Sequence, residues 1–217
     1  MANKGKYYES QFEEATIELL REAHWQYTLG DDIHRKYTDP LIEEDLRNFL
    51  AVQYKDKNLT TSEMDGIVAN LRNTGGQNDY YALRNAFLLY RDGYDFAYSD
   101  SRDNPFRMEY IDFEHPDHNI FRCVNQFVMG QGRENRRPDI LLFINGIPVC
   151  IIELKNPTKQ NATIRDAHTQ ICTRYMRDIP ALLKYCALAV ISDGAKNALG
   201  TTYTPFEFFY EWKKIEN

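Results

Sequence analysis

Residues 140–152 form an apolar stretch that is interrupted once, by Asn145-Gly146, and this stretch restricts the possible folds more than any other part of the sequence. An Asn-Gly pair between two runs of branched and aromatic residues is a strong signal for a β-hairpin. Glu153 and Lys155 stand at the end of the second run, and because side chains alternate along a strand, both project from one face. Two charged groups at the end of a run otherwise suited to burial indicate a functional site.

The turn of this hairpin decides whether Asp139 joins them. A two-residue loop would pair Asp139 with Ile152 and leave Glu153 on the opposite face, because cross-strand partners share a face. A three-residue loop over 144–146, with Gly146 left-handed, would instead pair Asp139 with Ile151 and place Glu153 diagonally beside it. We therefore predict the three-residue loop, or a bulge that corrects the parity.

Asp139, Glu153 and Lys155 together predict phosphodiester hydrolysis. Two converging carboxylates repel unless a cation lies between them, and such oxygen ligands favour a hard divalent ion such as Mg²⁺. A bound metal lowers the pKa of its water, while a lysine orients that water or stabilises the pentavalent phosphorus state. The opposing interpretation is a solvated ion pair on a strand end, since Pro-Asp and Glu-x-Lys are short motifs.

The pattern of the chain changes from helical to strand-like near residue 106. Apolar spacing predicts helices at 7–25, 41–54, 61–72 and 79–92, and Thr60 with Glu63 makes a possible capping box. Strands are predicted at 108–113, 119–129, 139–144, 148–155 and 185–192, with a helix at 166–177. This order predicts a single α/β domain with a core over about 6–30 and 106–217 and a mostly helical insertion over about 31–105.

Charge and composition exclude several classes of protein. The net charge of -6 argues against a surface that binds nucleic acid everywhere, but residues 131–177 hold eight Lys and Arg against four Asp and Glu. No apolar stretch approaches the ~20 residues that a membrane-spanning helix needs. Four cysteines without a Cys-x-x-Cys pair fit a reducing cytoplasm.

His115 and His118 form the one other pattern that suggests a metal, in the sequence His-Pro-Asp-His. A polar loop is the favoured interpretation of this segment.

The stretch from Arg137-Pro138-Asp139 through Asn145-Gly146 to Glu153-Leu154-Lys155 resembles the nuclease motif of type I restriction enzyme R subunits, which belong to the PD-(D/E)xK superfamily. The similarity continues through residues 9–13, 25–27, 164–167, 175, 183–185, 190–194 and 206–212. It implies a restriction-endonuclease-like core, in which helices flank a mixed central sheet.

The resemblance also implies roles for individual residues. Asp139 and Glu153 would be metal ligands for Mg²⁺, with the backbone carbonyl of Leu154 as a further ligand, and Lys155 would be the catalytic lysine. Glu13, on the first core helix, is a weaker candidate, because an acid on that helix approaches the metal in related nucleases, whereas a solvent-facing glutamate is at least as common.

The family also has a Gln-x-x-x-Tyr element after the motif. Gln170 and Tyr175 are five residues apart here, one more than in the family, so the spacing does not decide whether both side chains lie on one face of the helix. Basic side chains near the motif are candidates for contacts to the DNA backbone. They are Arg133, Arg136, Arg137, Lys159, Arg165, Arg174 and Arg177.

No Gly-x-x-x-x-Gly-Lys-Ser/Thr loop occurs in the chain, so ATP would be used only by motor domains further along a longer subunit, of which this chain would be an N-terminal fragment. The resemblance implies double-stranded DNA, those motor domains, and the modification and specificity subunits as partners, in the cytoplasm of a prokaryotic cell. The expected activity is a metal-dependent endodeoxyribonuclease with little sequence specificity of its own. The alternative is a non-cutting domain that clamps DNA or docks subunits.

Overall fold

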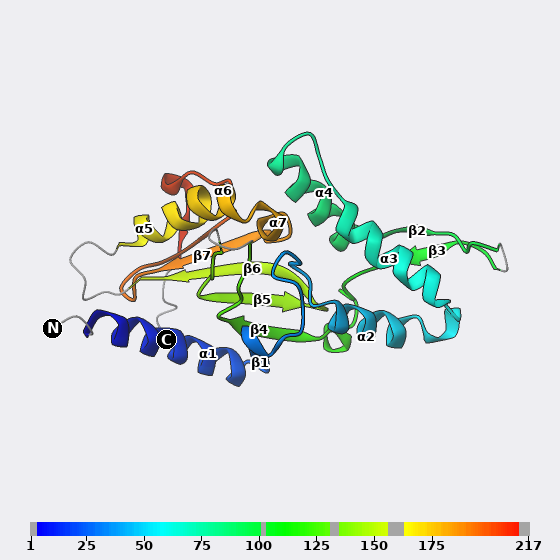
Figure 1. Ribbon diagram of the computed structural model, residues 1–217, viewed down its shortest axis with the longest axis horizontal. Helices are drawn as coiled ribbons and strands as arrows, with labels where there is room; N and C mark the ends of the chain where they lie inside the picture. The colour runs from blue at the N-terminus through cyan, green and yellow to red at the C-terminus, as the bar shows by residue number, and fades with distance from the viewer. Residues whose placement is uncertain (1–3, 101–102, 131–134, 156–162, 213–217) are drawn as a thin grey trace.

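A seven-stranded mixed sheet runs through the protein in the order β1-β4-β5-β6-β7-β8-β9 (Figure 1). The computed structural model describes residues 4–100, 103–130, 135–155 and 163–212. The strands are β1 Gln26–Leu29, β4 Phe121–Asn125, β5 Ile140–Ile144, β6 Ile147–Leu154, β7 Leu188–Ser192, β8 Asn197–Gly200 and β9 Tyr210–Glu211. β1 runs parallel to β4 and β6 parallel to β7, and the other neighbours are antiparallel. The fold is therefore mixed α/β.

Helices cover both faces of the sheet (Figure 1). Helix α1, Lys4–Glu22, packs Ile17 on the face that carries Ile140 and Ile152. The opposite face, which carries Leu141 and Ile151, is covered by a second group of helices. This group comprises α5 Ile164–Thr169, the π-helical turn η5 Gln170–Tyr175, α6 Met176–Asp178 and α7 Pro180–Leu183. Strands with both faces buried read as continuous apolar runs, which explains the sequence of β5 and β6.

A helical lobe adjoins the turn end of the β5–β6 hairpin. It contains α2 Glu43–Gln53, α3 Thr61–Asn73, α4 Asp79–Asp92 and a small sheet of β2 Tyr94–Phe96 and β3 Phe106–Met108. The capping box of Thr60 and Glu63 at the start of α3 is confirmed. Short 3-10 turns lie at η1 Gly30–Asp32, η2 Lys55–Lys57, η3 Pro116–His118 and η6 Phe206–Phe208. The lobe shares a core with the sheet, since Ile147 is buried among its apolar side chains.

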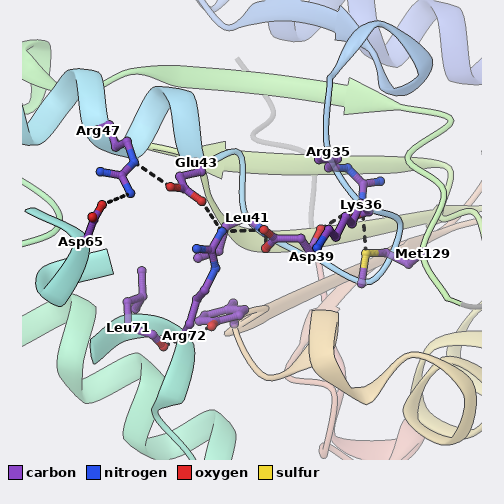
Figure 2. Close-up of polar contacts among 11 residues, drawn as sticks. Arg35, Lys36, Asp39, Leu41, Glu43, Arg47, Asp65, Leu71, Arg72 and Met129 are labelled. Atoms are coloured by element: carbon purple, nitrogen blue, oxygen red, sulfur yellow. Dashed lines mark hydrogen bonds and ion pairs between the residues drawn. The ribbon is translucent and has the colours of Figure 1, made fainter. Parts of the chain in front are cut away.

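Arg72 of α3 ties the lobe to the segment that leads into α2 (Figure 2). Its guanidinium donates to the carboxylates of Asp39 and Glu43, each at 2.5 Å. Arg47 adds bonds of 2.6 Å to Glu43 and to Asp65 of α3. Single exposed ion pairs contribute little, about 0–1 kcal/mol, but a linked set of charged hydrogen bonds fixes the orientation of the helices.

Several predicted elements differ from those observed. The strand predicted at 108–113 ends at Met108, because the following residues turn away from the ladder and Asp112 bonds within its own loop. Strands β1, β2, β8 and β9 were not predicted, and they are only two to four residues long. Such short strands lack the alternation that identifies a strand. Among the described residues, no helix combines the length and apolar character needed to cross a membrane.

Candidate active site

A β-bulge sets the register of the β5–β6 hairpin. Asn145 and Gly146 form a two-residue turn with φ of 51° and 75°, so the predicted three-residue loop is wrong. Phe143 pairs with Pro148 and Leu142 pairs with Cys150, which leaves Val149 as an extra residue. The bulge that was predicted as the other way to correct the parity is therefore confirmed.

Pro148 is the signal in the sequence that locates the bulge. Proline cannot donate to a ladder, so inside a sheet it occurs at edges, strand starts or bulges. Beyond the bulge Ile140 pairs with Ile152. The next residues outward, Asp139 and Glu153, therefore lie opposite each other on one face of the sheet.

Asp139 is held against the end of β6. Its Oδ2 accepts a hydrogen bond of 2.7 Å from the backbone amide of Leu154. In an extended strand the amide and carbonyl of one residue point to the same side, so the Leu154 carbonyl also faces the side of Asp139. The three oxygen groups that the resemblance implies as ligands thus lie at one end of the hairpin.

Glu153 is the most deeply buried charged group of the site, with 0% exposure. One carboxylate oxygen accepts from Lys155 Nζ at 2.7 Å and from the amide of Gln170, and the other accepts from the Tyr175 hydroxyl at 3.2 Å. Burial and then repulsion by Asp139 raise the pKa of Glu153 to about 8, against the lowering by Lys155 and Tyr175. Two acids and one lysine therefore share one end of the hairpin, where Glu153 is fully buried and Asp139 is half-buried.

A π-helical turn brings Gln170 and Tyr175 to the same face. The Met176 amide bonds to the Ile171 carbonyl five residues back, so the turn holds one residue more than an α-helical turn. As a result the Gln170 side chain donates to the Tyr175 hydroxyl at 2.7 Å, and both reach Glu153. The π-helical turn accommodates the extra residue between Gln170 and Tyr175. Both side chains therefore lie on one face, which the spacing alone did not decide.

Tyr175 is 2% exposed, and burial followed by the nearby Glu153 carboxylate raises its pKa above the ordinary value. The phenol therefore stays protonated at neutral pH and acts as a donor to Glu153.

Glu13 does not join the two acids closely. It lies half-buried on α1, where its Oε1 accepts from the side chains of Asn125 at 2.8 Å and Gln126 at 3.3 Å. Asn125 is the last residue of β4 and pairs with Ile140, the neighbour of Asp139, and Gln126 follows it. Among the described residues, the one group of three potential ligands within 4.8 Å of one another does not include Glu13, Asp139 or Glu153. Sequence reasoning did not identify Asn125 and Gln126, which carry no recognisable spacing signal.

Three of the candidate arginines are exposed near this end of the sheet. The Arg137 carbonyl accepts from the Tyr175 hydroxyl at 3.5 Å, and its side chain is exposed. Arg165 lies with its guanidinium 4.2 Å from the ring centre of Phe206. Arg174 is exposed on the π-helical turn. All three residues are exposed to solvent, and the Arg165 guanidinium has one face against the Phe206 ring.

Two other arginines have structural partners. Arg136 and Arg177 both bond to the Asp178 carboxylate, at 2.7 and 2.6 Å. Arg133 and Lys159 lie outside the described residues.

Comparison with known proteins identifies the family. The model of a family described as "Type I restriction enzyme R protein N terminus" matches residues 6–208. The chain belongs to this family.

Individual members of the type I restriction enzyme group support the assignment. The chain is 29% identical to the type I restriction enzyme HindI endonuclease subunit of Haemophilus influenzae, over 96% of this chain and 20% of that protein. It is 30% identical to the putative type I restriction enzyme MjaIXP endonuclease subunit of Methanocaldococcus jannaschii, over 94% of this chain and 20% of that protein. The chain thus spans 20% of the length of these endonuclease subunits.

Proposed function

We propose that this chain is the nuclease module of a type I restriction enzyme and hydrolyses DNA phosphodiester bonds with the help of Mg²⁺, with little sequence specificity of its own. Its fold would be a PD-(D/E)xK core over about 6–30 and 106–217, with residues 31–105 inserted into it. The observation that carries the proposal is the bulge at Val149, which puts Asp139 and Glu153 on one face of the sheet. Lys155 Nζ lies 2.7 Å from Glu153.

The chemistry of the donor set fits a hard divalent ion. Asp139, Glu153 and the Leu154 carbonyl offer oxygen atoms only, and such ligands suit Mg²⁺ rather than softer metals. The raised pKa of Glu153 reports a buried acid beside a second acid, an arrangement that costs free energy unless a cation compensates it. A bound Mg²⁺ would supply an acidic water and neutralise charge on the phosphate.

The chain's own residues would then divide the remaining work. Lys155, with its ammonium beside Glu153, would orient the attacking water or stabilise charge on phosphorus. Gln170 and Tyr175 act as positioning residues, because they hold the two oxygens of Glu153. Basic side chains on the open face would contact the DNA backbone. These are Arg137, Arg165 and Arg174.

The proposed partners follow from the relatives. Double-stranded DNA would be the substrate, and the remaining length of the subunit would contain the ATP-driven motor domains. Modification and specificity subunits would select the DNA site in a prokaryotic cytoplasm.

One observation favours a second candidate, a non-cutting domain that clamps DNA or docks subunits. The Lys155 ammonium already lies 2.7 Å from a Glu153 oxygen, as in a purely structural pair. The two candidates differ in metal binding, since a structural pair needs no ion.

The test combines metal binding with cleavage. We expect Mn²⁺ to bind the wild-type chain in calorimetry and to bind Asp139→Asn at least about tenfold more weakly, because the amide keeps an acceptor for Leu154 but loses the ligand charge. In the full-length subunit assembled with its partner subunits, Lys155→Ala should abolish cleavage. Lys196→Ala, an exposed lysine beyond β7, is the matched control and should cleave normally. Unchanged Mn²⁺ binding and unchanged cleavage would support the second candidate.

A further inference from the structure

A second set of potential metal ligands lies between β3 and β4, far from Asp139. Asp112, His115 and His118 each offer a ligand atom, and these atoms all lie within 4.8 Å of one another. Asp112 Oδ2 is 3.0 Å from His118 Nδ1 and 3.7 Å from His115 Nδ1. The histidine pattern was visible in the sequence, and the loop it predicted is observed, but the carboxylate that the Nδ1 atoms of both rings approach was not anticipated.

Both imidazole rings are oriented toward this carboxylate before any ion binds. The rings of His115 and His118 stack with centroids 4.9 Å apart and planes inclined by 16°. Pro116 begins the 3-10 turn that separates them, which restricts the loop. The two rings share one carboxylate oxygen as partner, so an ion that binds the His118 Nδ1 atom replaces the proton of its hydrogen bond to Asp112.

The carboxylate is fixed from behind. Asp112 is 4% exposed, and its Oδ1 accepts from the amides of Glu114 at 3.0 Å and His115 at 2.8 Å. The Gln53 amide, at the end of α2, donates to Oδ2 at 3.1 Å. Hydrogen bonds of this kind orient ligand groups in metal sites and are nearly as important as the ligands.

The distances suit a small transition-metal ion. Bonds of ~2.0–2.2 Å to nitrogen and oxygen in a tetrahedral site place neighbouring ligand atoms about 3.3 Å apart. The two observed separations, 3.0 and 3.7 Å, lie on either side of that value. Two imidazoles with one carboxylate are ligands for zinc-class ions, whereas Mg²⁺ prefers oxygen alone.

We propose that Asp112, His115 and His118 form a site for a divalent transition-metal ion of the zinc class, with the fourth position open to water. The site is separate from the nuclease site. It adjoins the turn of the β5–β6 hairpin, since Asn119 bonds both the Asp112 carbonyl at 2.7 Å and the Asn145 side chain at 2.8 Å. At ~3.3 Å per residue, the eight residues from Asn145 to Glu153 separate the two sites by roughly 20 Å or more.

The bound ion holds the loop against α2 and the hairpin turn. It therefore acts on the joint between the helical lobe and the sheet, while the proposed nuclease ion acts at the other end of the same strands.

Cobalt provides a direct probe, because Co²⁺ bound to imidazole and carboxylate has visible absorption bands that Mg²⁺ lacks. We expect one equivalent of Co²⁺ to produce these bands in the full chain, and Zn²⁺ to displace it and bleach them. The titration is performed in Asp139→Asn as well as in wild type, so that cobalt at the nuclease site is recognised separately. Failure of either proposal is then distinguishable from failure of the other.

Variants decide the assignment. His115→Ala and His118→Gln should each weaken Co²⁺ binding by at least about tenfold, and Gln53→Ala by a smaller factor. The glutamine at 118 keeps a donor for Asp112, so the loop remains folded without the imidazole. His34→Ala removes an exposed histidine outside the cluster and should bind normally. Equal cobalt binding by wild type and a His115→Ala/His118→Gln double variant would overturn the proposal, as would the absence of any cobalt binding by the wild type.

Discussion

The two ends of the β5–β6 hairpin each bury a polar side chain completely, and they do so in opposite ways. At the turn, Asn145 donates to the Tyr110 carbonyl at 2.9 Å and to Asn119 at 2.8 Å, and accepts from the Ile120 amide at 2.7 Å. All three partners are neutral, and together they use both donor hydrogens and the carbonyl oxygen of the amide. A fully satisfied amide stabilises a fold without storing charge.

Glu153, at the other end, is equally buried but lies beside Asp139, and its pKa is raised to about 8. Apolar residues of similar volume would usually be neutral or more stable there. Burial alone therefore does not identify a functional group. A buried polar group whose charge remains costly is the stronger candidate for chemistry.

The largest expected effect separates the two ends by activity. Glu153→Gln should lower DNA cleavage by the assembled enzyme by about 10³-fold or more, because it removes a proposed ligand that acts in the transition state. ATP hydrolysis by the assembled subunit is the control for correct assembly and should be unchanged. Cleavage within a few fold of wild type would contradict a role in catalysis for the Glu153 end of the hairpin.

The second effect is a loss of stability with rising pH that the raised pKa of Glu153 should cause. In the metal-free chain the raised pKa of Glu153 favours the folded protonated form, so its contribution to stability is complete below pH 4.5 and is lost as pH rises through about 8. The loss should reach about 4 kcal/mol by pH 8. Urea unfolding at several pH values should show the decline in wild type and not in Glu153→Gln, and parallel curves would contradict the assignment.

The third effect belongs to the turn. Asn145→Ala should lower the free energy of unfolding by about 3 kcal/mol, since it leaves the Ile120 amide and the Tyr110 carbonyl without their partner. Asn48→Ala, an exposed asparagine, should change it by less than about 0.5 kcal/mol. Cleavage per folded molecule should stay at the wild-type level. A selective loss of activity would place Asn145 in the same class as Glu153.

A smaller effect is expected at Tyr175. Tyr175→Phe removes the 3.2 Å hydrogen bond to Glu153 but keeps the ring in the core, so Mn²⁺ affinity and cleavage should each fall about tenfold. Isothermal titration with Mn²⁺ measures the Mn²⁺ affinity, and Phe209→Leu, at a ring that packs on His168, serves as a packing control. No change in Mn²⁺ affinity would show that Tyr175 only fills space.

The smallest effect tests the π-helical turn. Deletion of Thr173, which is exposed, should return the turn to an α-helix and leave Gln170 four residues before the tyrosine, on the same face. Cleavage should stay within about threefold of wild type. A loss of tenfold or more would mean that the π turn itself is required.

Much of this hairpin was predictable from the sequence, and the parts that were not depend on backbone irregularities. Side-chain alternation and the Asn-Gly pair predicted the strands and the position of the turn. Elsewhere in the chain, Thr60 and Glu63 predicted a helix start that is observed. A longer loop and a bulge would both put Asp139 and Glu153 on one face of the sheet. Pro148 is the residue that indicates the bulge.

The π turn and the Asp112 cluster were beyond sequence reasoning for different reasons. An extra residue in a helix can shift every following side chain or be absorbed in one turn, and tertiary packing of Tyr175 decides between them. Asp112 becomes a partner of two histidines only because its loop folds back, which a predicted strand over 108–113 excludes.

Anomalous diffraction from a crystal soaked in Mn²⁺ would show directly whether Asp139 and Glu153 hold a metal ion. We expect a peak in contact with the carboxylates of Asp139 and Glu153 and the Leu154 carbonyl, at ~2.0–2.3 Å from each oxygen. An ordered site in which Lys155 still bonds Glu153 and no manganese lies between the two acids would contradict the proposed metal site.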